Sequence, residues 1–167
     1  PDDAANDTTW WVLDAAAGYS GPTTVAAGTL EVAAADAVAA SEVTVGSGAT
    51  LAAAPGTTIR APRVTLAGGT LAAATLAVNA AAGIETLAIN AGGLAGGASL
   101  VVGPGGLVEL PAAARVTIAV AGLELDEAAG GGRLDLGGGE IAIQPGSLTE
   151  AELVADILAG RGDGSWD

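Results

Sequence analysis

The chain has 167 residues, half of them hydrophobic, yet it carries 27 Gly and only three Trp and one Tyr as aromatic residues, so a core built on large side chains is excluded. It contains no Cys, His or Lys, which removes the thiol nucleophile, the neutral-pH general base, the Schiff-base amine and the best transition-metal ligands. Most enzyme classes are excluded by these missing side chains. The net charge of −14 opposes binding to a phosphate backbone, so a nucleic-acid partner is excluded as well.

The length and the even repetition predict one β-solenoid domain over residues 1–167. Residues 1–19 are assigned to an N-terminal arm or cap. The run TTWWVL places Trp10 and Trp11 there, and this pair is half of all the aromatic residues. Protein interfaces concentrate binding energy in such side chains. We therefore expect the pair to lie in the N-terminal cap or the first coil.

Residues 20–146 contain short triplets in which two apolar residues flank one position, and the triplets form two series. The first series begins at Leu30, Leu51, Leu71, Leu94, Leu107 and Leu123. The second series begins at Val43, Val64, Leu87, Leu100 and Val116. The spacings of the two series lengthen and shorten together, as stacked coils do. The triplet at Leu76 fits neither series, and a pairing of Leu87 with Val108 is an alternative register.

Period-2 alternation of Val, Leu, Ile and Thr favours strands in this region, and the Gly-rich pieces between them favour tight corners. Strands that recur about every 20 residues without helices between them are typical of a parallel β-solenoid. The alternative for the Ala-rich segment Val32 to Glu42 is a helix, since Ala has the highest helix propensity. The pattern therefore predicts an all-β fold over residues 20–146.

Residues 147–167 are predicted to be a helical closing segment. Thr149 and Glu152 form a capping box, and Gly160 stands where a left-handed C-cap is expected, so the one predicted helix spans about 149–159. Its apolar stripe contains Leu153, Ile157 and Leu158. The end of a solenoid leaves a strand edge unpaired and the last stacked apolar side chains uncovered. We therefore expect this helix to cover one end of the solenoid.

Two segments resemble a known family. The run YSGPTTVAAGTLEV (Tyr19 to Val32) resembles the autotransporter-associated β-strand repeat, and Gly132 to Asp167 is similar to the closing segment that follows such repeats in large secreted bacterial proteins. Together they cover about 50 of the 167 residues. The resemblance implies a right-handed parallel β-helix on a secreted or bacterial cell-surface protein, with a structural or adhesive role and no catalytic residues.

The acidic residues follow no recognisable metal-binding loop. Asp126 and Glu127, like the acids at both chain ends, could join a Ca²⁺ site, but a solvated acidic surface accounts for them better. We expect no cofactor, and any bound calcium would be a surface or inter-subunit ion rather than a requirement for folding. Glu85 and Glu109 are the acids of residues 57–121, which is too few for a typical polysaccharide-cleaving face. We therefore expect no enzyme activity.

Two hypotheses about function remain. The first is a secreted structural module of a cell-surface fibre, layer or stalk that associates with itself end to end. The second is an adhesin module that binds a carbohydrate or a surface on a lateral face, with cell-surface polysaccharide as its partner. The uncharged stretches are too rich in Ala, Gly, Thr and Asn to span a membrane. The residues that we expect at the self-association contact are Trp10, Trp11, Leu153, Ile157, Leu158 and Trp166.

Overall fold

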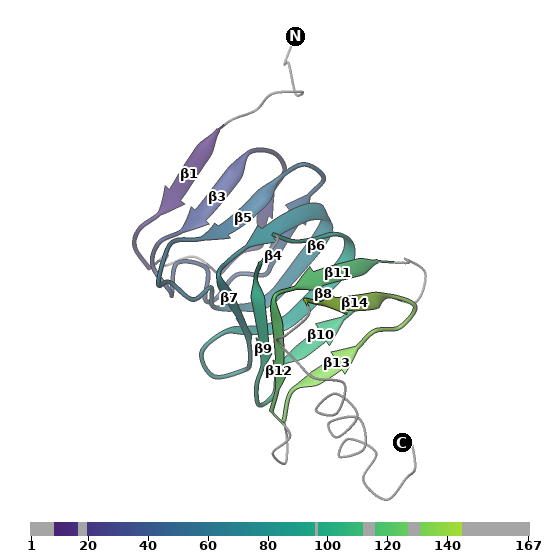
Figure 1. Ribbon diagram of the computed structural model, residues 1–167. Coiled ribbons are helices and arrows are strands. Elements are labelled where there is room, and N and C mark those ends of the chain that lie inside the picture. The colour runs from purple at the N-terminus through teal and green to yellow at the C-terminus, as the bar shows by residue number, and fades with distance from the viewer. Residues whose placement is uncertain (1–8, 17–19, 96, 112–115, 127–130, 145–167) are drawn as a thin grey trace, which may run out of the picture.

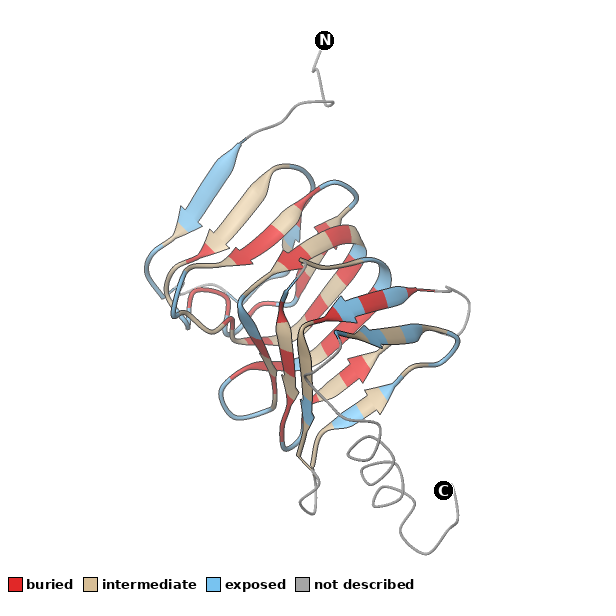
Figure 2. Cartoon of the chain, viewed as in Figure 1, coloured by how far each residue is buried: buried red, intermediate tan, exposed pale blue. Residues whose placement is uncertain are grey.

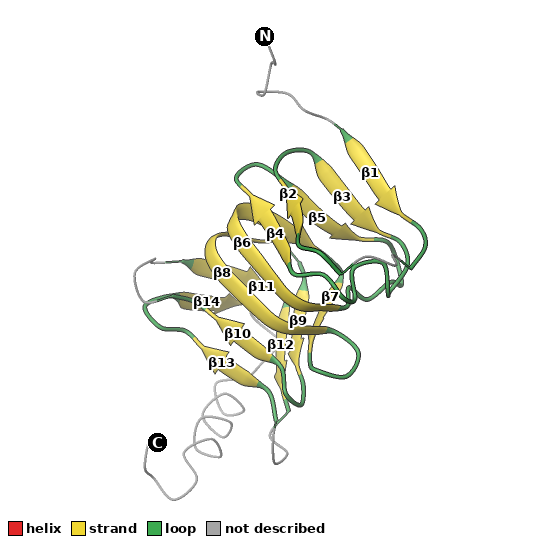
Figure 3. Ribbon diagram, turned by 180° about the vertical axis from the view of Figure 1, so that it is seen from behind, coloured by secondary structure: helices red, strands yellow, loops and turns green. Residues whose placement is uncertain are grey.

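The computed structural model describes residues 9–16, 20–95, 97–111, 116–126 and 131–144. In these ranges the chain is a parallel β-solenoid of about five turns, and no helix occurs among them (Figure 3). The coils stack from β1 (Trp10–Leu13) at one end of the molecule to β13 (Arg133–Asp135) and β14 (Glu140–Ile143) at the other (Figure 1). The predicted helical closing segment, residues 147–167 with its helix at about 149–159, lies entirely outside the described residues.

The strands stack on three faces, which we number by chain order within a coil. Face 1 consists of β2 (Thr23–Val25), β4 (Val43–Gly46), the first parts of β6 (Ala61–Ala72) and β8 (Ile84–Leu94), β10 (Leu107–Glu109) and β13. Face 2 consists of β1, β3 (Thr29–Val32), β5 (Thr50–Ala53) and the last parts of β6 and β8. Face 3 consists of β7 (Thr75–Val78), β9 (Ser99–Val102) and β12 (Gly122–Leu125).

Two strands complete the last coils. β11 (Thr117–Val120) pairs in parallel with β14 and contacts β8. In chain order β11 follows β10 of face 1 and precedes β12 of face 3, so this pair occupies the place of face 2. Every strand pairing in the described ranges is parallel, as the repeat predicted.

The predicted register is confirmed up to β8. Leu30, Leu51, Leu71 and Leu94 are consecutive register partners on face 2. On face 1, Val43, Val64 and Leu87 pair in the same way.

Beyond Leu87 the predicted series is wrong and the alternative holds, because Leu87 pairs with Val108. Leu100 instead pairs with Leu76 and Leu123 on face 3. The short step of 13 residues from Leu87 to Leu100 is therefore a step between two faces of one coil, and the unassigned triplet at Leu76 is the start of face 3.

Face 3 is absent from the first described coils because turns occupy its place. The Ala-rich segment after Val32 forms such a turn and not the alternative helix. Its bonds join residues three apart: the Ala37 N–H donates to the Ala34 carbonyl and the Ser41 N–H to the Val38 carbonyl, both at 3.0 Å. Ser41, which is completely buried, donates its hydroxyl to the Gly21 carbonyl at 2.7 Å and fixes this turn to the preceding coil.

The core is a set of apolar ladders inside the coils, seen as buried bands across the strands in Figure 2. Leu87 is 0 % exposed and lies between Val64 and Val108, which are also 0 % exposed. Burying a side chain of this size contributes about 1.5–3 kcal/mol. Thin ladders of this kind replace the aromatic core that the composition excluded.

Glycines let β6 and β8 turn from face 1 to face 2 without a break in the strand. Gly92 has a φ of 87°, and a Cβ added there would meet the Gly69 carbonyl oxygen of the coil below. Gly69 is itself close to the backbone of Gly46, since its added Cβ would lie 2.6 Å from the Gly46 oxygen. The small residues therefore set how closely successive corners stack.

Candidate functional site

The N-terminal end of the solenoid carries an exposed apolar strand. Trp10, Trp11 and Val12 of β1 are 59 %, 65 % and 49 % exposed, and in the described part of the chain they are the exposed large hydrophobic residues. Figure 2 shows β1 as the exposed strand at the end of the stack. Monomeric proteins rarely expose contiguous apolar patches, so this strand is a candidate interaction surface. We call residues 10–13 the N-terminal edge.

The backbone of the N-terminal edge is paired on one side. β1 pairs in parallel with β3, and the Thr29 N–H donates to the Thr9 carbonyl at 2.8 Å. Among the described strands, none pairs with the other side of β1. A strand with one unpaired side is a template for further pairing. The prediction that the tryptophans lie in a cap or the first coil is thereby decided, because they lie in a strand of the first coil.

Alternation along β1 places its side chains on two sides. Trp11 pairs with Leu30 and Leu13 with Val32, so both continue the core ladder of face 2. Trp10 and Val12 lie on the outer side. Trp11 is thus exposed although it stands on the core side, because no described coil covers it.

The other predicted contact residues lie outside the described residues. They are Leu153, Ile157, Leu158 and Trp166. Of the six residues expected at the contact, the structure therefore locates Trp10 and Trp11 and places them side by side at one end. It adds Val12, which the sequence analysis missed. Its signal was the period-2 alternation within WWVL, where Val12 follows Trp10 on the outer side.

At the opposite end, the last described strands expose their own ladder ends. Leu134 of β13 and Ile141 and Ile143 of β14 are partly buried and pack against the core. Ile141 pairs with Ile118 and Ile143 with Val120, both of which are buried. The two ends of the described solenoid are therefore both apolar on the core side.

A lateral groove of about 530 Å³ crosses face 1. The Arg63 guanidinium donates to a Glu109 carboxylate oxygen at 2.8 Å, although the two residues are 46 positions apart and β8 lies between their strands. Ala88 of β8 is only 2 % exposed on the outer side, which indicates that the ion pair covers it. The groove is lined by Arg63, Ala88, Asn90, Glu109, Leu110, Pro111, Asp135 and Gly137.

The groove brings together residues that the sequence analysis had treated as too few for a polysaccharide site. Glu109 pairs in register with Asp135, so two carboxylates stand on neighbouring strands. Asp135 accepts a hydrogen bond from the Gly137 N–H at 3.0 Å, and this bond orients the carboxylate. The available signal was the spacing of 46 residues between Arg63 and Glu109. Two coil lengths take Arg63 to Leu107, and Glu109 is the next residue on the same side of that strand.

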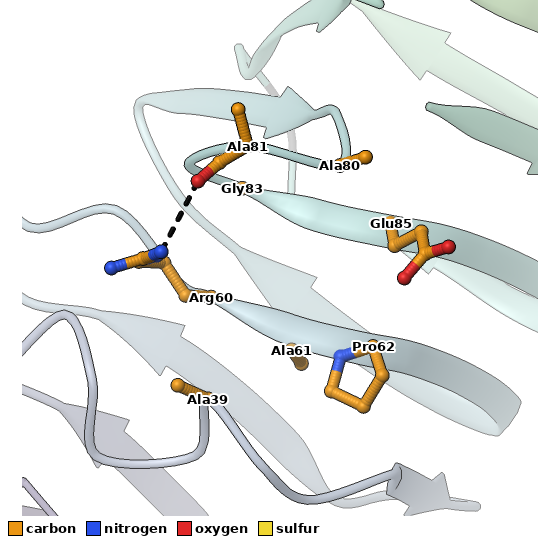
Figure 4. A pocket seen from close by; sticks show the side chains of 8 residues that line it. All are labelled: Ala39, Arg60, Ala61, Pro62, Ala80, Ala81, Gly83 and Glu85. Atoms are coloured by element: carbon orange, nitrogen blue, oxygen red, sulfur yellow. Dashed lines mark hydrogen bonds between the residues drawn. The ribbon is translucent and has the colours of Figure 1, made fainter. Parts of the chain in front are cut away.

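A smaller pocket of about 130 Å³ lies near Arg60. Figure 4 shows the Arg60 side chain directed to the Ala81 carbonyl, to which it donates at 3.1 Å, and away from Glu85. Its other nitrogen pairs with Asp36 at 2.6 Å. Both terminal nitrogens of the Arg60 guanidinium thus join neighbouring turns. Small side chains line most of the pocket. This arrangement stabilises the turns and provides no chemistry.

In the ranges that the structure describes, no group of three or more acidic side chains is placed to hold a metal ion. In those ranges, too, no helix is long and apolar enough to cross a membrane. Comparison of the chain with family models, with curated proteins and with solved structures yields no match.

Proposed function

We propose that this chain is a structural β-solenoid module that associates end to end and forms part of a secreted or cell-surface fibre, layer or stalk. The observation that carries the proposal is the N-terminal edge, where the exposed large apolar side chains of the described residues stand on a strand with one unpaired side. The secreted, right-handed character rests on the resemblance of Tyr19 to Val32 and of Gly132 to Asp167 to the autotransporter-associated repeat. The closing segment, with Leu153 to Trp166, is proposed to contribute to the contact.

The physical basis is the cost of leaving a solenoid end open. An added strand would satisfy the unpaired backbone groups of β1 and remove Trp10, Trp11 and Val12 from water. Electrostatics acts against this gain, because residues 1–56 carry seven acids and no base (−7), and residues 122–167 carry ten acids and two Arg (−8). Salt screens such repulsion. A divalent cation such as Ca²⁺ would act in the same way between subunits.

Light scattering of a double variant tests the proposal. Replacing Trp10 and Trp11 by Ser removes most of the apolar surface of the N-terminal edge. It changes no buried residue, because Trp11, at the end of the face 2 ladder, is exposed. We expect the particle mass to fall to that of the monomer while the far-ultraviolet circular dichroism spectrum keeps its β character. A matched control, Val101→Ser, changes a half-buried residue of β9, which is paired on both sides by β7 and β12, and should leave the mass unchanged. An unchanged mass in a folded double variant would contradict end-to-end association.

The lateral groove supports a second candidate function, the binding of a polysaccharide. Arg63, Asn90, Glu109 and Asp135 present donors and acceptors for sugar hydroxyl groups on an open surface. Calorimetric titration of the wild type and of Arg63→Ala with bacterial cell-surface polysaccharide tests this candidate. Binding that the variant loses would support it, and the absence of heat in both proteins would contradict it. We propose no catalytic role and no cofactor for either function.

A further inference from the structure

We propose that the end-to-end contact is a parallel strand addition in which β14 of one copy pairs with β1 of the next. The pairing sets Ile141 opposite Trp11 and Ile143 opposite Leu13, and it therefore sets Ala142 opposite Val12. This inference rests on the proposed function and specifies its geometry. The occupant of the N-terminal edge is thus a second copy of this chain.

The apolar phase of the two end strands supports this register. Trp11 and Leu13 are on the core side because they pair with Leu30 and Val32. Ile141 and Ile143 are on the core side because they pair with Ile118 and Val120. Alignment of the two pairs continues the ladder of face 2 from one copy to the next.

A slip by one residue would break this ladder. In a strand, successive side chains point to opposite sides, so the slip would bring exposed Glu140 or Ala142 into line with the core side chains of β1. The carboxylate of Glu140 would then be buried without a partner, which is costly. The apolar phase therefore selects registers that differ by two residues, and the proposed one overlaps the four positions of both strands.

The proposed register also avoids opposing like charges. Glu140 stands opposite Trp10, and one position beyond the strands Asp14 stands opposite Gln144. Like charges directly opposite each other on neighbouring strands are destabilising. The acids that make both ends negative therefore act on this contact at longer range, where salt screens them.

The symmetry of such a contact predicts an open assembly. β1 and β14 lie at opposite ends of the stack, so each copy uses two different surfaces (Figure 1). Head-to-tail contacts of this kind do not close by two-fold symmetry. Copies that add along the stack therefore form filaments or short linear oligomers.

Cysteine cross-linking tests the register directly, because the chain has no Cys of its own. The double variant Val12→Cys with Ala142→Cys places thiols at two exposed outer positions that would be register partners. Neighbouring strands lie about 4.8 Å apart, within the Cα separation of about 4.4–6.8 Å that a disulfide needs. One molecule cannot bridge its own ends, so every disulfide formed joins two copies.

The matched control is Val12→Cys with Glu140→Cys, which moves one thiol by two residues on the same side of β14. The offset of about 6.6 Å along the strand puts these thiol-bearing positions about 8 Å apart, too far for a disulfide. After mild oxidation, a non-reducing gel should show a ladder of multimers at least about tenfold stronger for the first variant than for the control. Mixing the two single variants Val12→Cys and Ala142→Cys should give dimers alone.

The outcomes separate this inference from the proposed function. Equal cross-linking in the two double variants, or none in either, overturns the register. If light scattering still shows an assembly that Trp10→Ser with Trp11→Ser disperses, end-to-end association stands without this pairing. If the wild type is monomeric at every salt concentration, both proposals fall.

Discussion

The glycine corner between faces 1 and 2 makes a quantitative prediction about stability. Gly92 and Gly97 have almost the same positive φ, 87° and 88°. Their surroundings differ, since a Cβ on Gly92 would meet the Gly69 carbonyl oxygen, whereas a Cβ on Gly97 would meet nothing within 4 Å. Replacing each by Ala therefore separates the cost of the conformation from the cost of the contact.

The two costs can be added from the structure. A side chain in the left-handed region costs about 1–2 kcal/mol, and both variants incur this. Overpacking adds about 1–3 kcal/mol, and it applies to Gly92→Ala alone because the atom that is met is backbone and cannot rotate away. We expect Gly97→Ala to lose about 1–2 kcal/mol of the free energy of unfolding and Gly92→Ala about 2–5 kcal/mol.

Urea unfolding followed by far-ultraviolet circular dichroism measures both values under one condition. The midpoint should fall much further for Gly92→Ala, with the dependence on urea unchanged for both variants. Equal losses would refute the reasoning, because they would mean that successive corners do not stack as closely as the backbone of Gly69 and Gly92 requires.

Three further predictions concern the ladder, the groove and the charge. Leu87→Ala should lower the free energy of unfolding by about 2–5 kcal/mol in urea titrations. Leu107 is half-buried on the outer side and precedes Val108, the register partner of Leu87, and its change to Ala should lower the same free energy by less than about 1 kcal/mol. Glu109→Gln should cost less than about 1 kcal/mol by the same titration, because the Arg63 and Glu109 side chains are 41 % and 38 % exposed, and the loss should shrink in 1 M salt. The particle mass from light scattering should rise as the salt is raised from about 10 mM to about 1 M, since the Debye length falls from about 30 to about 3 Å; a mass that falls would contradict an apolar contact opposed by charge.

The N-terminal half of the fold could be predicted because its coils repeat with little change. Leu30, Leu51 and Leu71 follow one another at one coil length, and their place on the core side of face 2 follows from alternation alone. From Leu76 on, the coils gain a third strand, which is β7, β9 or β12. The Leu triplets of face 3 look the same in sequence as those of the other faces, and only the corners decide to which face a triplet belongs.

The candidate sites show the same division. The position of Trp10 and Trp11 at one end follows from their rarity and their place before the first repeat. The groove could not be predicted from the sequence, because Arg63 and Glu109 approach each other only when the coils stack. No local sequence motif indicates this contact. Sequence spacing identifies such a pair only once the coil length in that part of the chain is known.

The unbroken passage of β6 and β8 round their shared corner has a consequence for cooperativity. Each coil of a solenoid contacts only its neighbours, so opening proceeds coil by coil from the ends. β6 and β8 differ from the other coils, because each is one continuous strand that pairs along two faces, and Arg63 reaches beyond β8 to Glu109. Amide hydrogens of these two strands should therefore exchange with solvent last, as one unit, whereas those of β1 and β14 exchange first. The centre of the molecule is then its most stable unit, and the outer coils open and close against it.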